Sequence, residues 1–379
     1  MAVTKKEESL KDILQARPMS KLSDAFYSKD VGRVKGKLVY FNDELFPRLS
    51  AVKEDIAKEL SLFVDWSGKN AEFEAKALPT HSRSFSFNHI LVDKEGRVWK
   101  YVCVKGGGMS MRNIPEDIQP VDQHDRLHEA QGLFDIEGAI ADRDFSMLFL
   151  KNGVKTTAPF MIIEITEVIM KDGGRKSIED LKKARKLTKK IRYDKEILPY
   201  RPVLYVRLFS EVMRLQDAKK QDFEKFASEH GMSPKEYRRW WIERGAQNLA
   251  GIHRLGKYHG NISSHNLTLD GCIVDNDGVK DVSFDDATRI DLTDFLCSIL
   301  YCVPASETRE LSRTFIEKYL EGRGNIEERE LKHLEAEFGG HYSSFGRDLR
   351  LAYAEFGDAI AMEIQRRFNR KAAASSDAA

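Results

Sequence analysis

The sequence predicts an α+β protein with two lobes, because strand patterns fill its first half and helix patterns its second. Between residues 85 and 209, β-branched and aromatic residues stand in short runs bounded by turn residues. After residue 210, apolar residues recur at helical spacing. The 379 residues are enough for two lobes, each with its own core. We therefore expect an antiparallel sheet plus a helix in the N-lobe and a mostly helical C-lobe.

The N-lobe is expected over residues 81–212. Residues 85–92 and 97–105 read as two strands joined by the turn Asp93-Lys94-Glu95-Gly96, which makes a hairpin. Helix-period apolar positions follow over 126–151 and end at Asn152-Gly153. Two more strands are expected at 159–170 and 202–209. Residues 1–80 are only weakly periodic, so we expect an N-terminal extension that packs on this lobe.

The C-lobe is expected over residues 213–379. Ser233-Pro234-Lys235-Glu236 has a capping serine, a first-turn proline and a glutamate three residues after the cap, which together mark a helix start. Gly256 is a plausible stop for this helix. Further helical patterns cover 290–303, 306–321, 325–338 and 343–370.

Charge restricts the partners. The formal net charge is +1, which disfavours nucleic acid as a partner through bulk electrostatics. Residues 171–195 nevertheless hold eleven Lys or Arg against four Asp or Glu. This basic segment is either a solvated helical or mobile insertion between strands, or a surface for an acidic partner or a phosphate-bearing substrate.

Cysteine usage and hydropathy indicate a compartment. The four cysteines include no CxxC pair, so neither a disulfide framework nor a zinc site is expected. No apolar run reaches the length of a membrane span. We expect a cytoplasmic protein, with a secreted effector as the open alternative.

The segment 259–275 carries the clearest chemistry. His259-Gly260-Asn261-Ile262-Ser263-Ser264-His265-Asn266 is followed nine residues after Asn266 by Asp275. A turn between them would bring the two oxygen donors Asn266 and Asp275 to one face, where they could hold Mg²⁺ against nucleotide phosphates. The alternative is a buried His-Gly turn followed by a hairpin with a surface aspartate.

Cations that could bind phosphate occur elsewhere. Lys105 ends a strand and precedes Gly106, Gly107 and Gly108, whose N–H groups could form a small anion nest. Arg207 and Arg214 stand seven apart, and Arg207 lies in an apolar run. They could bind phosphate, or Arg207 could pair with a structural carboxylate.

Two further patterns are weaker. Glu137 follows the glycines on the expected helix and could pair with Lys105, with Glu129 and Asp142 as rivals. His124 and His128 have the i, i+4 spacing of helical metal ligands, but no other motif nearby supports a metal there.

Together these residues resemble the selenoprotein O family, protein-kinase-like proteins that transfer AMP from ATP to protein hydroxyls. That family carries His-Gly-x-x-Asn-Thr-Asp-Asn with the metal aspartate nine residues later, which His259, Gly260, Asn266 and Asp275 match. Two phosphate arginines seven apart correspond to Arg207 and Arg214. Three further segments are similar to segments of that family: Glu95 to Gly108, Gly153-Val154-Lys155-Thr156-Thr157, and Phe26-Tyr27-Ser28. In the first of them, one extra residue stands between Trp99 and Lys105. Arg83 stands near the position of another phosphate-contacting arginine.

The resemblance implies a bilobal protein-kinase-like fold in which ATP lies flipped relative to an ordinary kinase. Asn266 and Asp275 would then hold Mg²⁺, or Mn²⁺ in its place. The cations of Lys105, Arg207 and Arg214 would converge on the triphosphate. The implied reaction is transfer of AMP to a hydroxyl of a protein or a small molecule.

Two departures leave alternatives open. His265 replaces the aspartate that precedes the metal asparagine, and either acts as the general base or marks altered or lost activity. Asn261 stands where small-molecule kinases of the His-Gly-Asp type carry their catalytic aspartate. The alternatives are a phosphotransferase of the same fold, in which Asp285 competes with Asp275 for the metal, and a catalytically silent nucleotide-binding pseudokinase scaffold.

Overall fold

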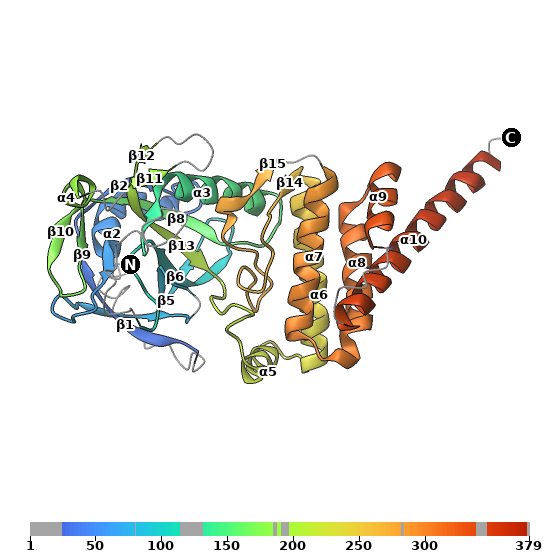
Figure 1. Cartoon of the computed structure of the whole chain (residues 1–379), viewed down its shortest axis with the longest axis horizontal. Helices are drawn as coiled ribbons and strands as arrows, with labels where there is room; N and C mark the ends of the chain where they lie inside the picture. Colours follow the sequence, from blue (N-terminus) through green and yellow to red (C-terminus); the bar gives the residue numbers. More distant parts are fainter. Residues whose placement is uncertain are drawn as a thin grey trace, which may run out of the picture. The chain divides into compact units, whose positions relative to one another are not determined.

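The computed structural model describes residues 25–79, 81–113, 132–184, 188–190, 197–281, 284–338 and 347–376. The chain divides into two compact units, Met1–Asp144 with Thr157–Val212, and Phe145–Thr156 with Met213–Ala379. The α+β class is confirmed: the first unit is built on an antiparallel sheet and the second on helices (Figure 1). His124, His128 and Glu129 lie outside the described residues.

The sheet of the first unit has nine strands among the described residues, all paired antiparallel. In spatial order eight of the strands are β2 (Gly36–Phe41), β8 (Ala158–Ile165), β13 (Pro202–Phe209), β6 (Val98–Lys105), β5 (Ser84–Val92), β4 (Phe73–Ala77), β1 (Tyr27–Arg33) and β3 (Leu62–Val64). The ninth strand, β7 (Phe134–Asp135), lies off this path and pairs with β13.

Four of these strands precede residue 80, within the segment expected to pack on the lobe as an extension. Tyr27 of β1 pairs with Ala77 of β4, and Val31 of the same strand pairs with Val64 of β3. The 3-10 helix η1 (Pro47–Val52) and the helix α2 (Lys53–Leu60) connect β2 to β3. Residues 27–77 are therefore part of the sheet itself.

The centre of the sheet is its most buried part. Every residue of β13 is buried, as expected for a strand covered on both faces. Its register sets Tyr205 opposite Lys105 and Arg207 opposite Cys103 on β6. Because paired and alternate residues share a face, Lys105, Tyr205 and Arg207 project from the same face of the sheet. The helix α3 (Ile136–Lys151) contributes Asp142 to that face.

Two sequence-based boundaries were wrong. The helix expected from residue 126 begins at Ile136, because Phe134 and Asp135 pair with Val203 and Pro202 of β13. The single strand expected over 159–170 is two, β8 and β9 (Glu167–Ile169). The chain turns at Thr166, whose N–H donates to the Lys35 carbonyl, so that β9 pairs with β10 (Arg175–Ser177) instead.

The basic segment 171–195 is only partly helical. It contains β10, the six-residue helix α4 (Ile178–Lys183) and β11 (Thr188–Lys190), which pairs with β12 (Ile197–Pro199). The side chain of Ser177 accepts from the N–H of Asp180, which starts α4. Residues 185–187 and 191–196 lie outside the described residues.

The second unit is a group of helices around an aromatic stack. The rings of Trp241, Phe295, Phe315 and Phe356 follow one another at centroid distances of 5.3, 4.4 and 5.5 Å. They come from helices that contact one another. The helices are α5 (Lys220–Glu229), α6 (Pro234–Arg254), α7 (Phe284–Cys302), α8 (Ala305–Arg323), α9 (Glu328–Phe338) and α10 (Arg347–Ser376).

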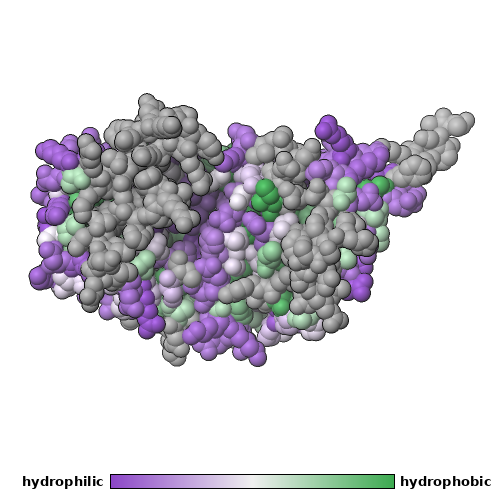
Figure 2. Space-filling view, viewed as in Figure 1, coloured by the Kyte–Doolittle hydropathy of each residue, from purple (hydrophilic) through white to green (hydrophobic). Residues whose placement is uncertain are grey.

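The surface is mostly polar. On the face drawn in Figure 2, hydrophilic colours predominate over the described residues. The exposed large hydrophobic residues of the first unit include Ile90, Val92 and Val98, all on the β5–β6 hairpin. Within the described ranges, no helix combines the length and the apolar character needed to span a membrane.

Candidate functional site

The segment 259–275 belongs to the second unit and is anchored at both ends. It follows α6, whose start has the expected capping box: Ser233 accepts from the N–H of Glu236, and the Glu236 carboxylate accepts from the N–H of Ser233. The short strand β14 (Lys257–Tyr258) precedes the segment and pairs with β15 (Lys280–Asp281), which follows it. This pairing brings the two ends of the segment together.

A buried carboxylate holds the start of the segment. Asp291 of α7 is fully buried, and its Oδ2 and Oδ1 accept from the N–H groups of His259 and Gly260 at 2.9 and 2.8 Å. Its Oδ2 also lies 3.0 Å from Nε2 of His253, whose Nδ1 is 2.9 Å from the Tyr319 hydroxyl. Asp291 therefore fixes the backbone from which the His-Gly turn begins.

A small hairpin brings residues 266 and 275 together, as expected. The Val274 N–H donates to the Asn266 carbonyl at 3.0 Å, and Leu267 forms an antiparallel bridge with Ile273. The turn is closed by Thr268, whose hydroxyl donates to Asp270 at 2.6 Å and accepts from the N–H of Cys272 at 3.0 Å. Gly271 supplies the left-handed residue of the turn, with φ +77°.

Asp275 has an unusual backbone. Among the described non-glycine residues it alone has a positive φ, with φ 61° and ψ 58°. Aspartate tolerates this region better than most residues, but such strain persists only where the surroundings enforce it. The fully buried Asn276 does so: its Nδ2 donates to the hydroxyls of Ser146 and Thr156 at 2.8 and 2.9 Å. Strained residues cluster at ligand-binding sites, which makes Asp275 a candidate ligand.

Asn266 is fixed in an orientation that suits a metal ligand. It is 3% exposed, and its Nδ2 donates to the Asn261 carbonyl at 3.0 Å. Only the NH₂ end of an amide can donate, so this bond determines which end of the side chain is oxygen.

The donor set fits Mg²⁺. No group of three or more His, Cys, Asp or Glu side chains that could hold a metal occurs within the described ranges. Mg²⁺ accepts such a sparse set, because it is commonly held by one or two protein oxygens together with substrate phosphates and water. Asn266 and Asp275 would supply those two oxygens.

Arg214 lies beside the predicted metal ligands. It forms a bridge with Thr268 of the hairpin, and the Leu215 N–H donates to the Leu267 carbonyl at 2.9 Å. Its side chain is 3% exposed, and its Nη2 is 3.9 Å from Oδ2 of Asp275. A buried guanidinium at this distance can bind a phosphate that shares its metal with Asp275.

His265 is half-buried at the same place. Burial lowers its pKa, the Asp275 carboxylate raises it, and Arg214 lowers it further, with a net pKa below the usual 6.5. The imidazole is therefore neutral near pH 7 and can accept a proton. The structure thus brings Arg214, His265, Asn266 and Asp275 together in one unit, among the residues predicted from sequence.

Lys105 and Arg83 lie together in the first unit. Lys105 is 4% exposed and ends β6 opposite Ser84 of β5. Its Nζ is 4.3 Å from the centroid of the Phe134 ring, and the guanidinium carbon of Arg83 is 5.0 Å from the same centroid. Both cations thus approach a single aromatic ring.

Two of the three glycines that were expected to form an anion nest after Lys105 use their N–H groups within the protein. The N–H of Gly106 donates to the Arg83 carbonyl and that of Gly108 to the Gly132 carbonyl, each at 2.8 Å. A Cβ on Gly107 would stand 2.5 Å from the Phe85 ring. Gly106 and Gly108 both have φ +92°. These glycines let the chain pack closely after β6, and two of their N–H groups are used within the protein.

Arg207 pairs with a structural carboxylate, the alternative left open by the sequence. Its Nη1 is 3.4 Å from Oδ2 of Asp142, and both side chains are almost fully buried. The Tyr205 hydroxyl donates to Oδ1 of the same carboxylate at 2.9 Å. Burial and the nearby Asp142 raise the pKa of Tyr205 above its usual range, so the hydroxyl keeps its proton. Glu137, in the first turn of α3, is exposed.

Sequence reasoning missed Asp291 and Asn276. Asp291 binds backbone groups 31 and 32 residues away, and Asn276 binds side chains 120 and 130 residues away. Neither position carries a local pattern that distinguishes it from an ordinary helix or turn residue.

Comparisons with known proteins identify no family. No family model and no curated protein matches the sequence. Two similar solved structures come from Toxoplasma gondii. One is ROP2, described as a virulence factor with a protein-kinase fold and no enzymatic activity, which is 11% identical at a TM-score of 0.32 and covers 79% of this chain and 84% of its own. The other is the kinase domain of a specific rhoptry antigen, 13% identical at 0.28, covering 79% and 85%.

At these low TM-scores the two likenesses do not bear on the reaction. A lysine-bearing strand, a helix, further strands and a helical unit with an asparagine and an aspartate in a loop follow one another along the chain, which is the order that the sequence predicts for a protein-kinase-like fold. The finer resemblance to the selenoprotein O family stays a prediction.

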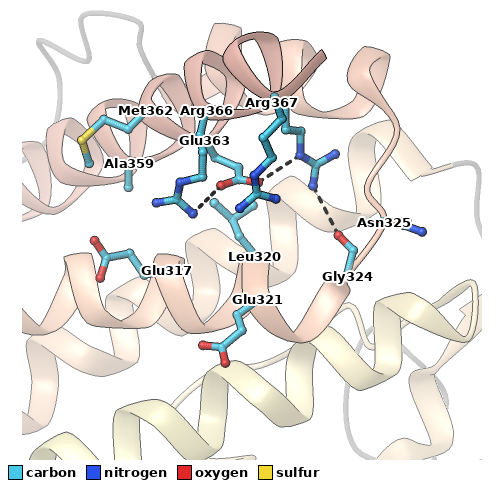
Figure 3. Close-up of a pocket in the computed structure, with 11 residues that line it drawn as sticks. Glu317, Leu320, Glu321, Gly324, Asn325, Ala359, Met362, Glu363, Arg366 and Arg367 are labelled. Carbon is cyan, nitrogen blue, oxygen red and sulfur yellow. Dashed lines mark hydrogen bonds and ion pairs between the residues drawn. The ribbon is translucent and has the colours of Figure 1, made fainter. Parts of the chain in front are cut away.

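A cavity of about 790 Å³ lies elsewhere in the second unit, beside α8 and α10 (Figure 3). Its charged lining is largely paired internally: Arg366 and Arg367 both contact Glu363, and Arg367 also reaches the Gly324 carbonyl. None of the residues predicted from sequence lines it. It is therefore not part of the candidate site.

Proposed function

We propose that this protein is an ATP- and Mg²⁺-dependent transferase that moves AMP to a hydroxyl acceptor. The observation that carries the proposal is the grouping of Arg214, His265, Asn266 and Asp275 in one unit. Two oxygen ligands for a metal, a buried cation for phosphate and a neutral imidazole are the parts that nucleotide transfer to a hydroxyl needs.

Each residue has a role in the proposal. Asn266 and Asp275 would hold Mg²⁺, which neutralises charge on the phosphates when it is bound. Arg214 would bind the phosphates beside it, and Lys105 and the neighbouring Arg83 are the further phosphate-binding cations of the proposal. Arg207 is instead paired with Asp142. Glu137 keeps only its predicted role as a carboxylate partner for Lys105.

Two features favour AMP transfer over phosphate transfer. Asn261 stands where phosphotransferases of the His-Gly-Asp type carry their catalytic aspartate, and an amide cannot act as a base there. Arg214 lies against the metal ligand Asp275, at 3.9 Å. A cation at that place suits terminal phosphates held beside the metal, so that pyrophosphate becomes the leaving group.

One set of contacts favours the rival function, a catalytically silent nucleotide-binding scaffold. Arg207 already contacts Asp142, and the N–H groups of Gly106 and Gly108 already donate within the protein. With Arg207 and these two N–H groups already engaged, the first unit would bind phosphate through Lys105 and Arg83 only. The basic segment 171–195 would then be the surface for an acidic partner.

The test is incubation of the full chain with Mg²⁺ and ATP labelled separately on the α- and γ-phosphates. The first acceptor tested is the full chain itself. We expect the α label, and a mass increase equal to one AMP group, on protein. Retention of the γ label alone would establish phosphate transfer and overturn the proposal. A thermal shift with Mg²⁺-ATP and no covalent product would favour the scaffold.

Matched variants locate the metal. Asp275→Asn and Asn266→Ala should each lower AMP transfer roughly 100-fold or more, because charge on the phosphates is no longer neutralised. Asp281→Asn is the control, since the Asp281 side chain is 79% exposed and its carboxylate contacts Lys257. Equal activity of all three variants would show that the metal lies elsewhere, with Asp285 in the first turn of α7 as the next candidate.

A further inference from the structure

Three side chains of the segment form a closed ring of polar contacts. The hydroxyl of Ser263 lies 2.9 Å from Oδ1 of Asn261 and 2.8 Å from Nδ1 of His265. Nδ2 of Asn261 lies 3.4 Å from Nε2 of His265. Each of the three residues thus contacts the other two within a stretch of five residues. Asn261 is exposed, and the other two are half-buried.

Counting protons shows how this ring is arranged. With the Asn261 amide oriented as in the structure, the Ser263 hydroxyl donates to its Oδ1 and accepts at Nδ1 of His265, which then carries its proton. The amide NH₂ of Asn261 can only donate, so Nε2 of His265 must be the accepting nitrogen. Every contact then joins one donor to one acceptor. The imidazole is neutral, with its proton on Nδ1.

The contacts of His265 agree with a neutral imidazole. A charged imidazole carries a proton on both nitrogens, so Nε2 would face the NH₂ group of Asn261 with two donors in contact.

We propose that Ser263 and Asn261 are positioning residues that fix the tautomer of His265, so that the Nε2 lone pair is the base for the acceptor hydroxyl. The contact between Asn261 and Nε2 is the longest of the three, at 3.4 Å, and is the one that an incoming hydroxyl would replace. The Ser263 contact at Nδ1 stays in place and keeps the proton there.

This inference rests on the proposed function, whose chemical step it completes. The acceptor oxygen forms a bond to the α-phosphorus of ATP as its proton passes to Nε2 of His265. The bond between the α-phosphorus and the oxygen that bridges to the β-phosphate breaks, and pyrophosphate leaves. His265 then carries both protons and returns one to solvent.

The first experiment reads the tautomer without any need for activity. The full chain is labelled with ¹⁵N-histidine, and the His265 nitrogens are assigned by comparison with His265→Gln. We expect a protonated Nδ1 and an unprotonated Nε2 in the wild type near pH 7.5. In Ser263→Ala this preference should be lost, and in Ser263→Thr, which keeps the hydroxyl, it should be restored. A wild type with its proton on Nε2 would overturn the proposal.

The second experiment reads the reaction, with Ser264→Ala as the matched control, because Ser264 adjoins the ring of contacts without being one of its members. Ser263→Ala should lower kcat for AMP transfer about 10- to 100-fold with little change in KM for ATP. Ser263→Thr should recover most of it. Equal kcat for Ser263→Ala and Ser264→Ala would refute the positioning role.

The two experiments separate the two proposals. If the wild type shows the Nδ1 tautomer, and Ser263→Ala loses it, but no α label reaches any acceptor, the assignment of the ring stands and the proposed function fails. If AMP transfer occurs but the tautomer is unaffected by Ser263→Ala, the proposed function stands and this inference fails. AMP found on Ser263 itself would make that hydroxyl an acceptor and would also overturn the inference.

Discussion

At the scale of single residues, the choice of partner decides what each predicted site residue can do. Asp275 combines a left-handed backbone with a guanidinium 3.9 Å from its carboxylate. Arg207, of the same residue type as Arg214 and seven positions earlier, instead contacts Asp142. The same side chain therefore belongs to the candidate site at one position and to the internal packing of a sheet and helix at the other.

The Arg207–Asp142 contact gives a stability prediction. Asp142→Asn leaves the guanidinium of Arg207 buried beside a neutral amide, which should cost roughly 3–5 kcal/mol of unfolding free energy. Tyr205→Phe removes only the hydroxyl that donates to the same carboxylate and should cost about 2 kcal/mol. Urea unfolding of the two variants measures the difference. Similar costs would mean that Arg207 is not held by this carboxylate.

His253 gives a prediction about pH. It is fully buried, and burial lowers its pKa below 6.5 even though the Asp291 carboxylate raises it. The His253 imidazole therefore binds a proton less readily in the folded state than in the unfolded state. The stability that the neutral imidazole contributes is present above pH 6.5, and it is lost as the pH falls below 6.5 toward the pKa of His253 in the folded protein.

The measurement is the free energy of unfolding at a series of pH values between about 8 and 5 for the wild type and His253→Gln. The wild type should lose more stability than the variant as the pH falls. The control is His230→Gln, at an exposed histidine, which should follow the wild type. Parallel curves for the wild type and His253→Gln would contradict the assignment.

At the scale of elements, one helix sets the geometry of a loop. Asp291 on α7 accepts from two successive backbone N–H groups of the segment 259–275 and also contacts His253 on α6. The loop is thereby fixed at its first turn, before the hairpin that brings Asn266 beside Asp275. The sequence patterns that predict α6 and α7 contain no signal for this contact.

Asp291→Asn tests the role of α7. Asparagine has one acceptor oxygen instead of two, so at least one of the loop N–H groups loses its partner. We expect faster hydrogen exchange at the amides of His259 and Gly260 and a loss of roughly 2–3 kcal/mol in stability. Glu317→Gln on α8, an exposed carboxylate, is the control. Unchanged exchange at both amides would show that the loop is held by other contacts.

Some helices and strands were predictable from the sequence, and some of their boundaries were not. The hairpin of β5 and β6, the start of α6 and a turn between residues 266 and 275 were predicted from turn chemistry, capping and short apolar runs, and the structure confirms these three elements. The helix boundary at Ile136 and the division of β8 from β9 were missed. Both depend on pairing with strands distant in sequence, which no local pattern records.

At the scale of the whole molecule, the chain has two compact units with separate cores. The first is a sheet whose central strand is entirely buried, and the second contains the aromatic stack of Trp241, Phe295, Phe315 and Phe356. The four tryptophans of the sequence divide evenly, with Trp66 and Trp99 in one unit and Trp240 and Trp241 in the other.

This division allows a test with ¹⁹F-labelled tryptophan, which reports each unit in the same sample. Asp142→Asn should lower the urea midpoint seen by Trp66 and Trp99 more than that seen by Trp240 and Trp241, because the affected pair lies in the first unit. Ser233→Ala removes the cap of α6 and should cost about 1 kcal/mol of unfolding free energy. It should lower the midpoint seen by Trp240 and Trp241 more than that seen by Trp66 and Trp99. Equal shifts of all four signals would show one cooperative transition.

The sequence by itself determined the α+β class, the strands β5, β6, β8 and β13, most of the described helices, and the turn between Asn266 and Asp275, because periodicity, capping and turn chemistry act between residues close together in the chain. Only the tertiary structure decided that Asp142 is the carboxylate beside Arg207, that two of the glycine N–H groups are used internally, and that Asp291 holds the loop. These outcomes depend on which polar groups are buried together, and the cost of burying an unpaired group acts between residues 31 to 65 positions apart.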